Sequence, residues 1–181
     1  MTNSTTAPQK KIHVIQGEHY ISGEDEVMLS TVLGSCVAAC LHDPKAKVGG
    51  MNHFLLAESD NHADADAVRY GAYAMEVLIN GLLKKGADRK RLQAKVFGGA
   101  RMFDGLSDVG GGNARFIRKF LADEGIPLLS ESLGGTAARR VEFWPSSGRA
   151  RLRFTGGSDV EERRAPPRPV KPADDGNVEL F

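Results

Sequence analysis

The sequence has few cysteines, no long apolar run and no excess of one charge. Two cysteines among 181 residues are too few for the disulfide framework of a small secreted domain, which indicates reduced thiols in a cytoplasmic protein. No apolar run approaches the roughly 20 residues that a membrane-spanning helix needs. Lys and Arg (24) nearly balance Asp and Glu (23), so no overall field would recruit nucleic acid. We therefore expect a cytoplasmic protein with no nucleic-acid partner and no membrane insertion.

Length and local composition predict one folded domain between two tails. A chain of 181 residues is long enough for one hydrophobic core and short for two. Residues 1–10 are polar and lack the apolar core of a signal peptide, which predicts a disordered leader. Residues 157–181 are rich in proline and charge and predict a disordered tail. Its end at 178–181 is apolar enough to dock on the domain, and a frayed end is the favoured interpretation. The folded domain then covers residues 11–156.

Hydrophobic patterns inside this domain predict strands interleaved with two helices. Apolar residues recur at helical spacing over residues 64–85, and a second helix is predicted over 113–123 with Asn113 as its cap. Runs typical of strands cover residues 12–15, 26–33, 36–41, 48–56, 93–97, 127–133, 140–144 and 150–154. This order predicts an α/β layered sandwich of mixed or antiparallel sheets with two main helices, and not a Rossmann fold.

Cys36 is the strongest candidate for a nucleophile. The preceding Gly34 and Ser35 can form a tight bend, and the backbone N–H groups of Ser35 and Cys36 would then converge as an oxyanion hole requires. The alternative is a buried cysteine that packs as a small hydrophobe, which composition alone favours.

His53 is the candidate base for this thiol. A turn at residues 42–44 would fold the strands on either side into a hairpin and bring His53 back towards Cys36. An imidazole within hydrogen-bond reach would lower the thiol pKa. The hydroxyls of Ser30 and Thr31 are the nearest groups that could orient the ring, and alternation along a strand places Ser30 on the face of Cys36. A histidine satisfied in the core is the alternative.

Metal and nucleotide sites receive less support. Cys36, Cys40, His42 and His53 are residue types that bind zinc, but structural zinc ligands sit on turns, whereas residues 37–39 read as a strand. Glycine pairs or runs at 98–99, 110–112 and 134–135 lack the spacing of nucleotide-binding loops and predict tight loops around a site. We expect no metal and no cofactor.

Several of these segments together resemble the CheD family of chemoreceptor glutamine deamidases. The resemblance covers roughly residues 12 to 155, and the joint Leu-Gly-Ser-Cys and Asn-His-Phe pattern is its most specific part. The segments that carry it are Thr31–Ala38, Asp43-Pro44, Gly49–Leu56, Phe97–Ala100 with Met102-Phe103, the glycines before Asn113, Leu133–Gly135 and Ala138–Val141.

The resemblance implies a fold like that of deamidating toxins of the cytotoxic necrotizing factor type. It also implies a protein-glutamine glutaminase that converts receptor glutamines to glutamate, with Cys36 as nucleophile and His53 as base. The third catalytic position of the family, usually threonine, aligns with Ser30, and Thr31 lies beside it. The implied partners are methyl-accepting chemotaxis receptors and a CheC-type phosphatase; a binding module that docks on such a phosphatase is the alternative function.

A glutamine on a receptor helix protrudes, so the site must admit a helix surface. Loops around the predicted site are therefore expected to contact the substrate. The candidate residues are Phe97, Gly98, Gly99, Phe103 and Asn113.

Overall fold

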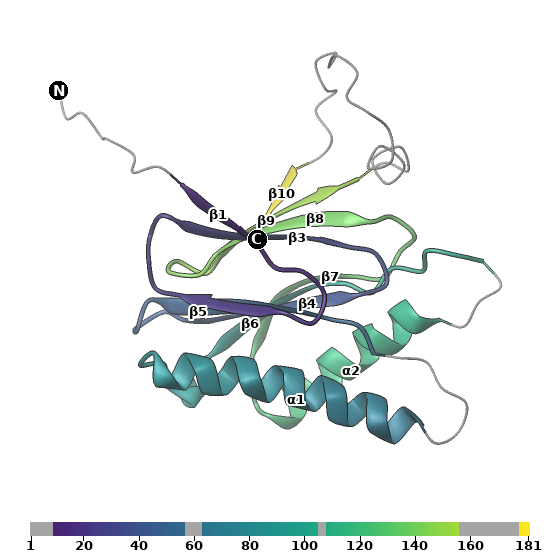
Figure 1. Cartoon of the computed structure of the whole chain (residues 1–181), viewed down its shortest axis with the longest axis horizontal. Coiled ribbons are helices and arrows are strands. Elements are labelled where there is room, and N and C mark those ends of the chain that lie inside the picture. Colours follow the sequence, from purple (N-terminus) through teal and green to yellow (C-terminus); the bar gives the residue numbers. More distant parts are fainter. Residues whose placement is uncertain (1–8, 57–62, 105–107, 156–177) are drawn as a thin grey trace, which may run out of the picture.

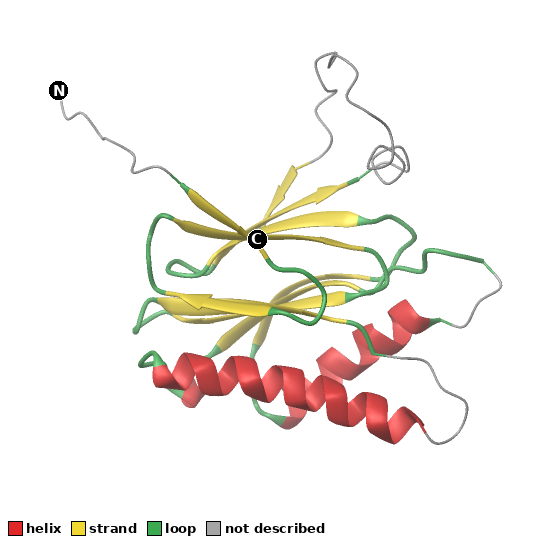
Figure 2. Ribbon diagram, in the orientation of Figure 1, coloured by secondary structure: helices red, strands yellow, loops and turns green. Residues whose placement is uncertain are grey.

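The computed structural model describes residues 9–56, 63–104, 108–155 and 178–181. Within them, two five-stranded sheets stack face to face, and two helices cover the free face of one sheet (Figures 1 and 2). The expected α/β sandwich with mixed sheets and two main helices is confirmed. The elements are β1 (Lys10–His13), β2 (His19–Ser22), β3 (Val27–Leu33), β4 (Val37–Asp43), β5 (Val48–Phe54), α1 (Ala63–Lys84), the short 3-10 helix η1 (Arg89–Arg91), β6 (Gln93–Gly98), α2 (Val109–Asp123), β7 (Leu128–Leu133), β8 (Arg139–Trp144), β9 (Arg149–Phe154) and β10 (Val178–Leu180).

The two sheets differ in their surroundings. The outer sheet has the strand order β1-β3-β8-β9-β10, and the central sheet, between the outer sheet and the helices, has the order β2-β5-β4-β6-β7. Each sheet has one parallel pair, β1 with β3 and β6 with β7, and its other pairs are antiparallel. Because β4 and β5 are covered on both faces, every one of their residues is buried, which explains their nearly continuous apolar runs.

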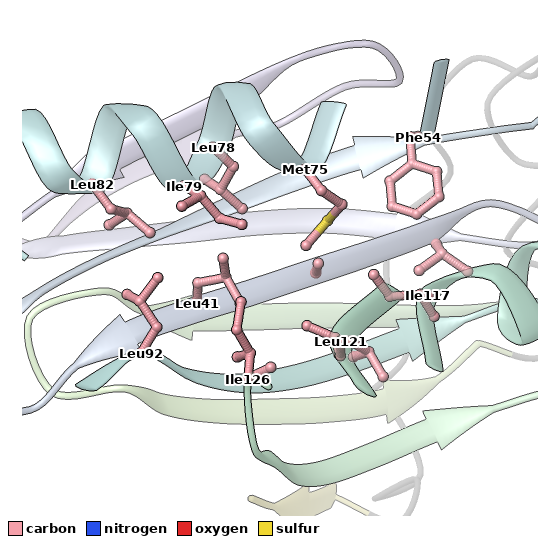
Figure 3. Close-up of a cluster of buried hydrophobic side chains, with 14 of the residues drawn as sticks. Leu41, Phe54, Met75, Leu78, Ile79, Leu82, Leu92, Ile117, Leu121 and Ile126 are labelled. Atoms are coloured by element: carbon pink, nitrogen blue, oxygen red, sulfur yellow. The ribbon is translucent and has the colours of Figure 1, made fainter. Parts of the chain in front are cut away.

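Two hydrophobic cores hold the three layers together. One lies between the sheets and includes Leu29, Met51 and Phe143. The other lies between the central sheet and the helices, where Leu41 of β4 packs with Leu78 of α1 and neighbouring side chains (Figure 3). Burial of these apolar side chains stabilises the stack by roughly 1.5–3 kcal/mol for each large one.

Helix α1 follows the prediction closely, whereas α2 begins four residues before the predicted start. Asp108 caps α2 by accepting a hydrogen bond from the Gly111 N–H at 2.9 Å. The run 110–112 is therefore the first turn of the helix and not a loop before it. A Cβ at Gly110 would lie 2.3 Å from the Ala100 carbonyl oxygen, so glycine is needed where the helix approaches the chain after β6. Neither described helix combines the length and apolarity that crossing a bilayer takes.

Both ends of the domain extend further than predicted. Lys10, placed in the leader, begins β1, and the unpredicted strand β2 pairs with β5. The frayed end expected at 178–181 is wrong, because β10 pairs with β9 as the last strand of the outer sheet, and the Phe181 ring meets Phe97 edge-on at 5.6 Å. The edge of β9 offers unpaired backbone groups, which this apolar segment satisfies. Residues 1–8 and 157–177, also predicted to be disordered, lie outside the described residues, as does residue 156 of the predicted domain.

Candidate active site

Cys36 lies where the chain passes from one sheet to the other. Strand β3 ends at Leu33 in the outer sheet and β4 begins at Val37 in the central sheet, so residues 34–36 form the link between them. The link is a bend, as predicted, and the Cys36 side chain is only partly buried there. This position leaves the thiol accessible at one end of the sandwich.

The loop after β6 holds the bend through two backbone hydrogen bonds. The Ala100 N–H donates to the Gly34 carbonyl at 2.9 Å, and the Gly99 N–H donates to the Cys36 carbonyl at 2.8 Å. Gly98 has a φ of +112°, and a Cβ there would lie 2.1 Å from the Cys36 carbonyl oxygen. Glycine at this position is therefore required for the loop to approach the nucleophile so closely.

Asn113 of α2 ties the bend to the end of β5. Its Nδ2 donates to the Ser35 carbonyl at 2.8 Å, and its Oδ1 accepts from the Leu56 N–H at 3.0 Å. The side chain is fully buried. The role of Asn113 in the described structure is therefore to position the backbone beside Cys36, and contact of its loop with substrate stays a prediction.

His53 is held in place by the predicted hairpin. Residues 37–43 of β4 pair with residues 48–54 of β5, and His53 lies directly opposite Ala38. Ala38 and Cys40 face the core between the sheets, and Cys36 packs against that core. The turn at 42–44 thus brings the histidine to the end of the sandwich that carries the cysteine.

The outer sheet supplies the group that orients His53. Thr31 of β3 places its Oγ1 2.9 Å from His53 Nδ1 and donates its own hydrogen to the Val14 carbonyl at 2.7 Å. His53 Nδ1 also lies 3.2 Å from that carbonyl oxygen. Both neighbours of Nδ1 are then acceptors, so we infer that Nδ1 carries the ring hydrogen and Nε2 carries the lone pair. Within the described residues, Nε2 is buried and has no hydrogen-bond partner.

Ser30, the residue aligned with the third catalytic position, lies elsewhere. Its Oγ is buried and has no hydrogen-bond partner among the described residues. Neighbouring residues of a strand point to opposite faces, and Thr31, not Ser30, faces His53. The prediction for Ser30 is wrong because it assumes one continuous strand from Ser30 to Cys36. The chain instead bends between these residues and passes from one sheet to the other.

Burial sets the protonation of both candidate catalytic groups. Burial raises the pKa of the Cys36 thiol above its ordinary value, and the residue's own backbone N–H offsets only part of that effect. Burial lowers the pKa of His53, and the Val14 carbonyl partly opposes the shift. The resting pair is therefore a thiol and a neutral imidazole. The expected lowering of the thiol pKa is wrong for this resting state, because a neutral ring provides no charge to stabilise a thiolate.

The Cys36 thiol has a partner that the sequence did not indicate. Cys36 Sγ lies 3.7 Å from Gln16 Oε1, within the range of a weak S–H donor, whereas no hydrogen bond joins Sγ to His53 across residues 9–56. Gln16 and Val14 belong to the segment between β1 and β2. The sequence predicts Val14 only as part of a strand over residues 12–15, and no motif or periodicity indicates a role at the site for either residue. Sequence reasoning missed both residues for that reason.

Of the other residues predicted to contact substrate, only Phe103 is exposed. Its side chain is 70% accessible, whereas Phe97 is fully buried between the sheets and Gly98 and Gly99 are buried. A cavity of about 80 Å³ beside the bend is lined by Ser35, Met102 and Phe103 among others. A larger cavity of about 660 Å³ lies between the helices, and Cys36 is not part of its lining.

The four residues considered as zinc ligands do not gather. Among the described residues, no group of three or more His, Cys, Asp or Glu side chains is arranged to hold a metal ion. Cys40 lies four residues from Cys36, with β4 continuous from Val37 onwards, which separates the two by roughly 13 Å at 3.3 Å per residue. Cys40 is buried in the core, as the alternative interpretation of a free cysteine requires.

Comparisons with known proteins identify similar sequences over nearly the whole chain. A family model described as "CheD chemotactic sensory transduction" matches residues 55–154, more than half of the chain. A protein of Caulobacter sp. (strain K31) is 58% identical and covers 97% of this chain and 95% of its own. One from Caulobacter vibrioides (strain NA1000 / CB15N) is 59% identical and covers 94% of this chain and 93% of its own. One from Agrobacterium fabrum is 51% identical and covers 97% of this chain and 98% of its own. Each bears the name "Probable chemoreceptor glutamine deamidase CheD".

Two solved structures share a weaker likeness. The Bacillus licheniformis hypothetical protein YfiH has a TM-score of 0.43 at 13% identity, over 63% of this chain and 49% of its own. Neisseria meningitidis protein NMB0706 has a TM-score of 0.44 at 11% identity, over 70% of this chain and 63% of its own. These scores are too low to support an argument about function.

Proposed function

This chain belongs to the CheD family, and on that premise we propose that it is a chemoreceptor glutamine deamidase. The reaction hydrolyses the side-chain amide of a receptor glutamine to glutamate and releases ammonia. The names of relatives that are 51–59% identical over almost the full chain support the substrate and the reaction. The chemistry of the site supports a cysteine nucleophile.

One observation carries the proposal for the site. His53 Nδ1 lies between two acceptors, Thr31 Oγ1 and the Val14 carbonyl, so its Nε2 is left with a free lone pair at the end of the sandwich that holds Cys36. A ring fixed in this tautomer is a general base. The neutral state of the thiol fits the same role, because the base removes a proton that is still present when substrate binds.

The proposed reaction has two steps. His53 Nε2 takes the thiol proton while Cys36 Sγ attacks the amide carbon, and the protonated ring then gives that proton to the departing ammonia, which leaves a thioester. In the second step His53 takes a proton from water, the hydroxide adds to the thioester, and the Sγ–C bond breaks. The thiolate regains the proton, and the glutamine has become glutamate.

Backbone N–H groups of the bend would stabilise the tetrahedral oxyanion. Across the described residues, the N–H groups of Ser35 and Cys36 donate to no other residue. These donors are fixed by the hydrogen bonds of the bend, which is the preorganisation that oxyanion stabilisation needs.

The substrate and the cellular context belong to the same proposal. Exposed Phe103 and the small cavity beside Ser35 provide a shallow surface for a cytoplasmic receptor helix. A CheC-type phosphatase partner and the likeness to deamidating toxins stay predictions from the family resemblance. The alternative of a binding module that has lost catalysis is less well supported, because Cys36 is a free, partly exposed cysteine and the Thr31 hydroxyl lies 2.9 Å from His53 Nδ1.

Mass spectrometry of a receptor cytoplasmic fragment incubated with the purified protein tests the proposal. We expect the mass gain of amide-to-acid conversion at specific glutamines, together with ammonia release. Cys36→Ala should fold and lose both signals, whereas Cys40→Ala is the matched control at a cysteine outside the site and should keep them. Ammonia release by Cys36→Ala would refute the cysteine mechanism, and no conversion by the unaltered protein would refute the function.

A further inference from the structure

Gln16 brings a carboxamide to the sulfur of the candidate nucleophile. Its Oε1 lies 3.7 Å from Cys36 Sγ, and this is the thiol's hydrogen bond within the described residues. The side chain is exposed, so it lies at the mouth of the site and not in the core. The proposed mechanism above assigns no task to this group.

A tight turn fixes the position of Gln16. The Glu18 N–H donates to the Ile15 carbonyl at 3.0 Å, and Gly17 has a φ of +87°, which together form a type II turn with Gln16 at its second position. The Ile15 N–H donates to Glu18 Oε2 at 3.1 Å and closes the turn from the other side. The backbone that carries Gln16 is therefore ordered by its own hydrogen bonds.

The same turn is attached to the backbone of the proposed base. The Gly17 N–H donates to the His53 carbonyl at 2.8 Å, and the His53 N–H donates to the Glu18 carbonyl at 3.0 Å. Val14, just before the turn, accepts the hydrogen bonds that set the His53 tautomer. The position of Gln16 is thus fixed relative to His53 as well as to Cys36.

A carboxamide at this place can serve both protonation states of the sulfur. In the resting state the S–H donates to Oε1. When the sulfur loses its proton, two electron-rich atoms would face each other, and a half-turn about the terminal torsion of Gln16 presents Nε2–H₂ instead. That torsion is broad and roughly two-fold, so the change is easy. The donor then points to the region where negative charge develops in the reaction.

The geometry points to Gln16 as a catalytic residue of the proposed deamidation, whose Nε2 donates to the sulfur anion and then to the oxyanion of the tetrahedral intermediate. The inference rests on the proposed function for its substrate. Gln16 would complement the backbone N–H groups of Ser35 and Cys36, because it reaches the thiol from a different part of the chain, the segment between β1 and β2. A side-chain amide is one of the groups that oxyanion holes commonly use.

Kinetics of two Gln16 variants test this role. Gln16→Ala removes the donor, and Gln16→Glu keeps the size but replaces the donor by an anion. We expect kcat to fall about 100-fold or more in both variants with little change in KM, as for loss of one oxyanion donor. Gln93→Ala is the control, because Gln93 lies on β6 opposite His42, away from the thiol, and its loss should leave kcat unchanged. Thermal unfolding should be the same for the unaltered protein and both Gln16 variants, because residue 16 is exposed.

The alkylation rate of Cys36 by iodoacetamide provides a second measurement that does not need the receptor. Compared with the unaltered protein, Gln16→Glu should shift the rate profile to higher pH, because a carboxylate beside the sulfur disfavours the thiolate. A purely structural role for Gln16 would lower the unfolding temperature of both variants without this shift.

The possible outcomes separate the inference from the proposed function. Suppose that the unaltered protein converts receptor glutamines. If both Gln16 variants then keep kcat within about threefold, or if the alkylation profile does not move, Gln16 is not catalytic and the deamidase proposal stands. If the unaltered protein converts no glutamine, the deamidase proposal fails, and the alkylation shift alone decides whether Gln16 acts on the thiol. A Cys36-dependent mass gain on the peptide that contains Gln16 would also overturn the inference, because the carboxamide would then be a substrate and not a donor.

Discussion

Thr31 Oγ1 and His53 Nδ1 lie 2.9 Å apart although their strands belong to different sheets. Thr31 is on β3 of the outer sheet and His53 is on β5 of the central sheet, and the Val14 carbonyl completes the contact. The tautomer of the proposed base thus depends on how the two sheets stack.

Thr31 and Ser30 should differ sharply when either is changed to alanine. Thr31→Ala removes a hydrogen bond worth about 1–3 kcal/mol at a buried site, so we expect deamidation to slow by about 5- to 150-fold. Thr31→Ser keeps the hydroxyl and should keep most of the activity. Ser30→Ala removes a buried hydroxyl that has no partner among the described residues, so the activity should persist and the unfolding temperature should stay the same or rise. Equal loss of activity in the Ser30 and Thr31 variants would contradict the assignment.

The acid limb of the activity profile should lie below the ordinary histidine pKa of about 6.5. His53 acts as a base only when it is neutral, and burial lowers its pKa, so the neutral form survives to lower pH than in a free histidine. Activity should therefore persist as pH falls through 6.5 and decline further down. A profile of kcat/KM against pH, with an NMR titration of the ring, measures this. An acid limb above 6.5 would show that another group, or a charged partner of His53, governs the profile.

Alanine at Gly98 should be far more damaging than alanine at Gly125. Both glycines have a positive φ, so either substitution strains the backbone by roughly 1–2 kcal/mol. A Cβ at Gly125 meets nothing within 4 Å, whereas one at Gly98 would lie 2.1 Å from the Cys36 carbonyl oxygen. We expect Gly125→Ala to be active with a slightly lower melting temperature. Gly98→Ala should melt much lower and lose activity, and similar melting of the two variants would argue against close contact between this loop and the bend.

Asp43 should support stability only above acidic pH. Its carboxylate is fully buried; burial alone would raise its pKa, but the Arg91 guanidinium and the N–H groups of Asp88, Ala46 and Lys45 outweigh that effect and hold the pKa well below its usual range. A carboxyl whose pKa is lower in the folded state than in the unfolded state stabilises the protein at any pH above its unfolded-state pKa of about 3.9. This stabilisation is lost as the pH falls through the folded-state pKa.

Unfolding of Asp43→Asn, measured at several pH values, tests this linkage. At neutral pH the variant should melt lower than the unaltered protein by about 5 °C, since it loses charge-assisted hydrogen bonds in a buried site. The difference should shrink once pH falls below about 3.9, where the unaltered carboxyl also begins to lose its advantage. A difference that does not depend on pH would mean that packing, and not charge, makes Asp43 stabilising.

Elements set by short sequence patterns could be predicted, whereas contacts between residues far apart in the sequence could not. The hairpin that carries His53, the bend before Cys36 and helix α1 follow from apolar periodicity and turn residues within about twenty positions of each other. The sequence predicts the start of α2 too late, because its glycines are typical of a loop and only the close approach of Gly110 to the Ala100 carbonyl explains them within a helix. The docking of β10 beside β9 depends on an edge that no local pattern describes.

The sequence by itself determined that a cysteine, a histidine and two neighbouring hydroxyls stand in a layered α/β domain of the CheD family. Only the tertiary structure decided that Thr31 orients His53, that Asn113 is buried behind the bend, and that Gln16 reaches the thiol. The physical reason is that side-chain alternation predicts which way a residue points within one strand. It carries no information across the link at residues 34–36, where the chain leaves one sheet and enters the other.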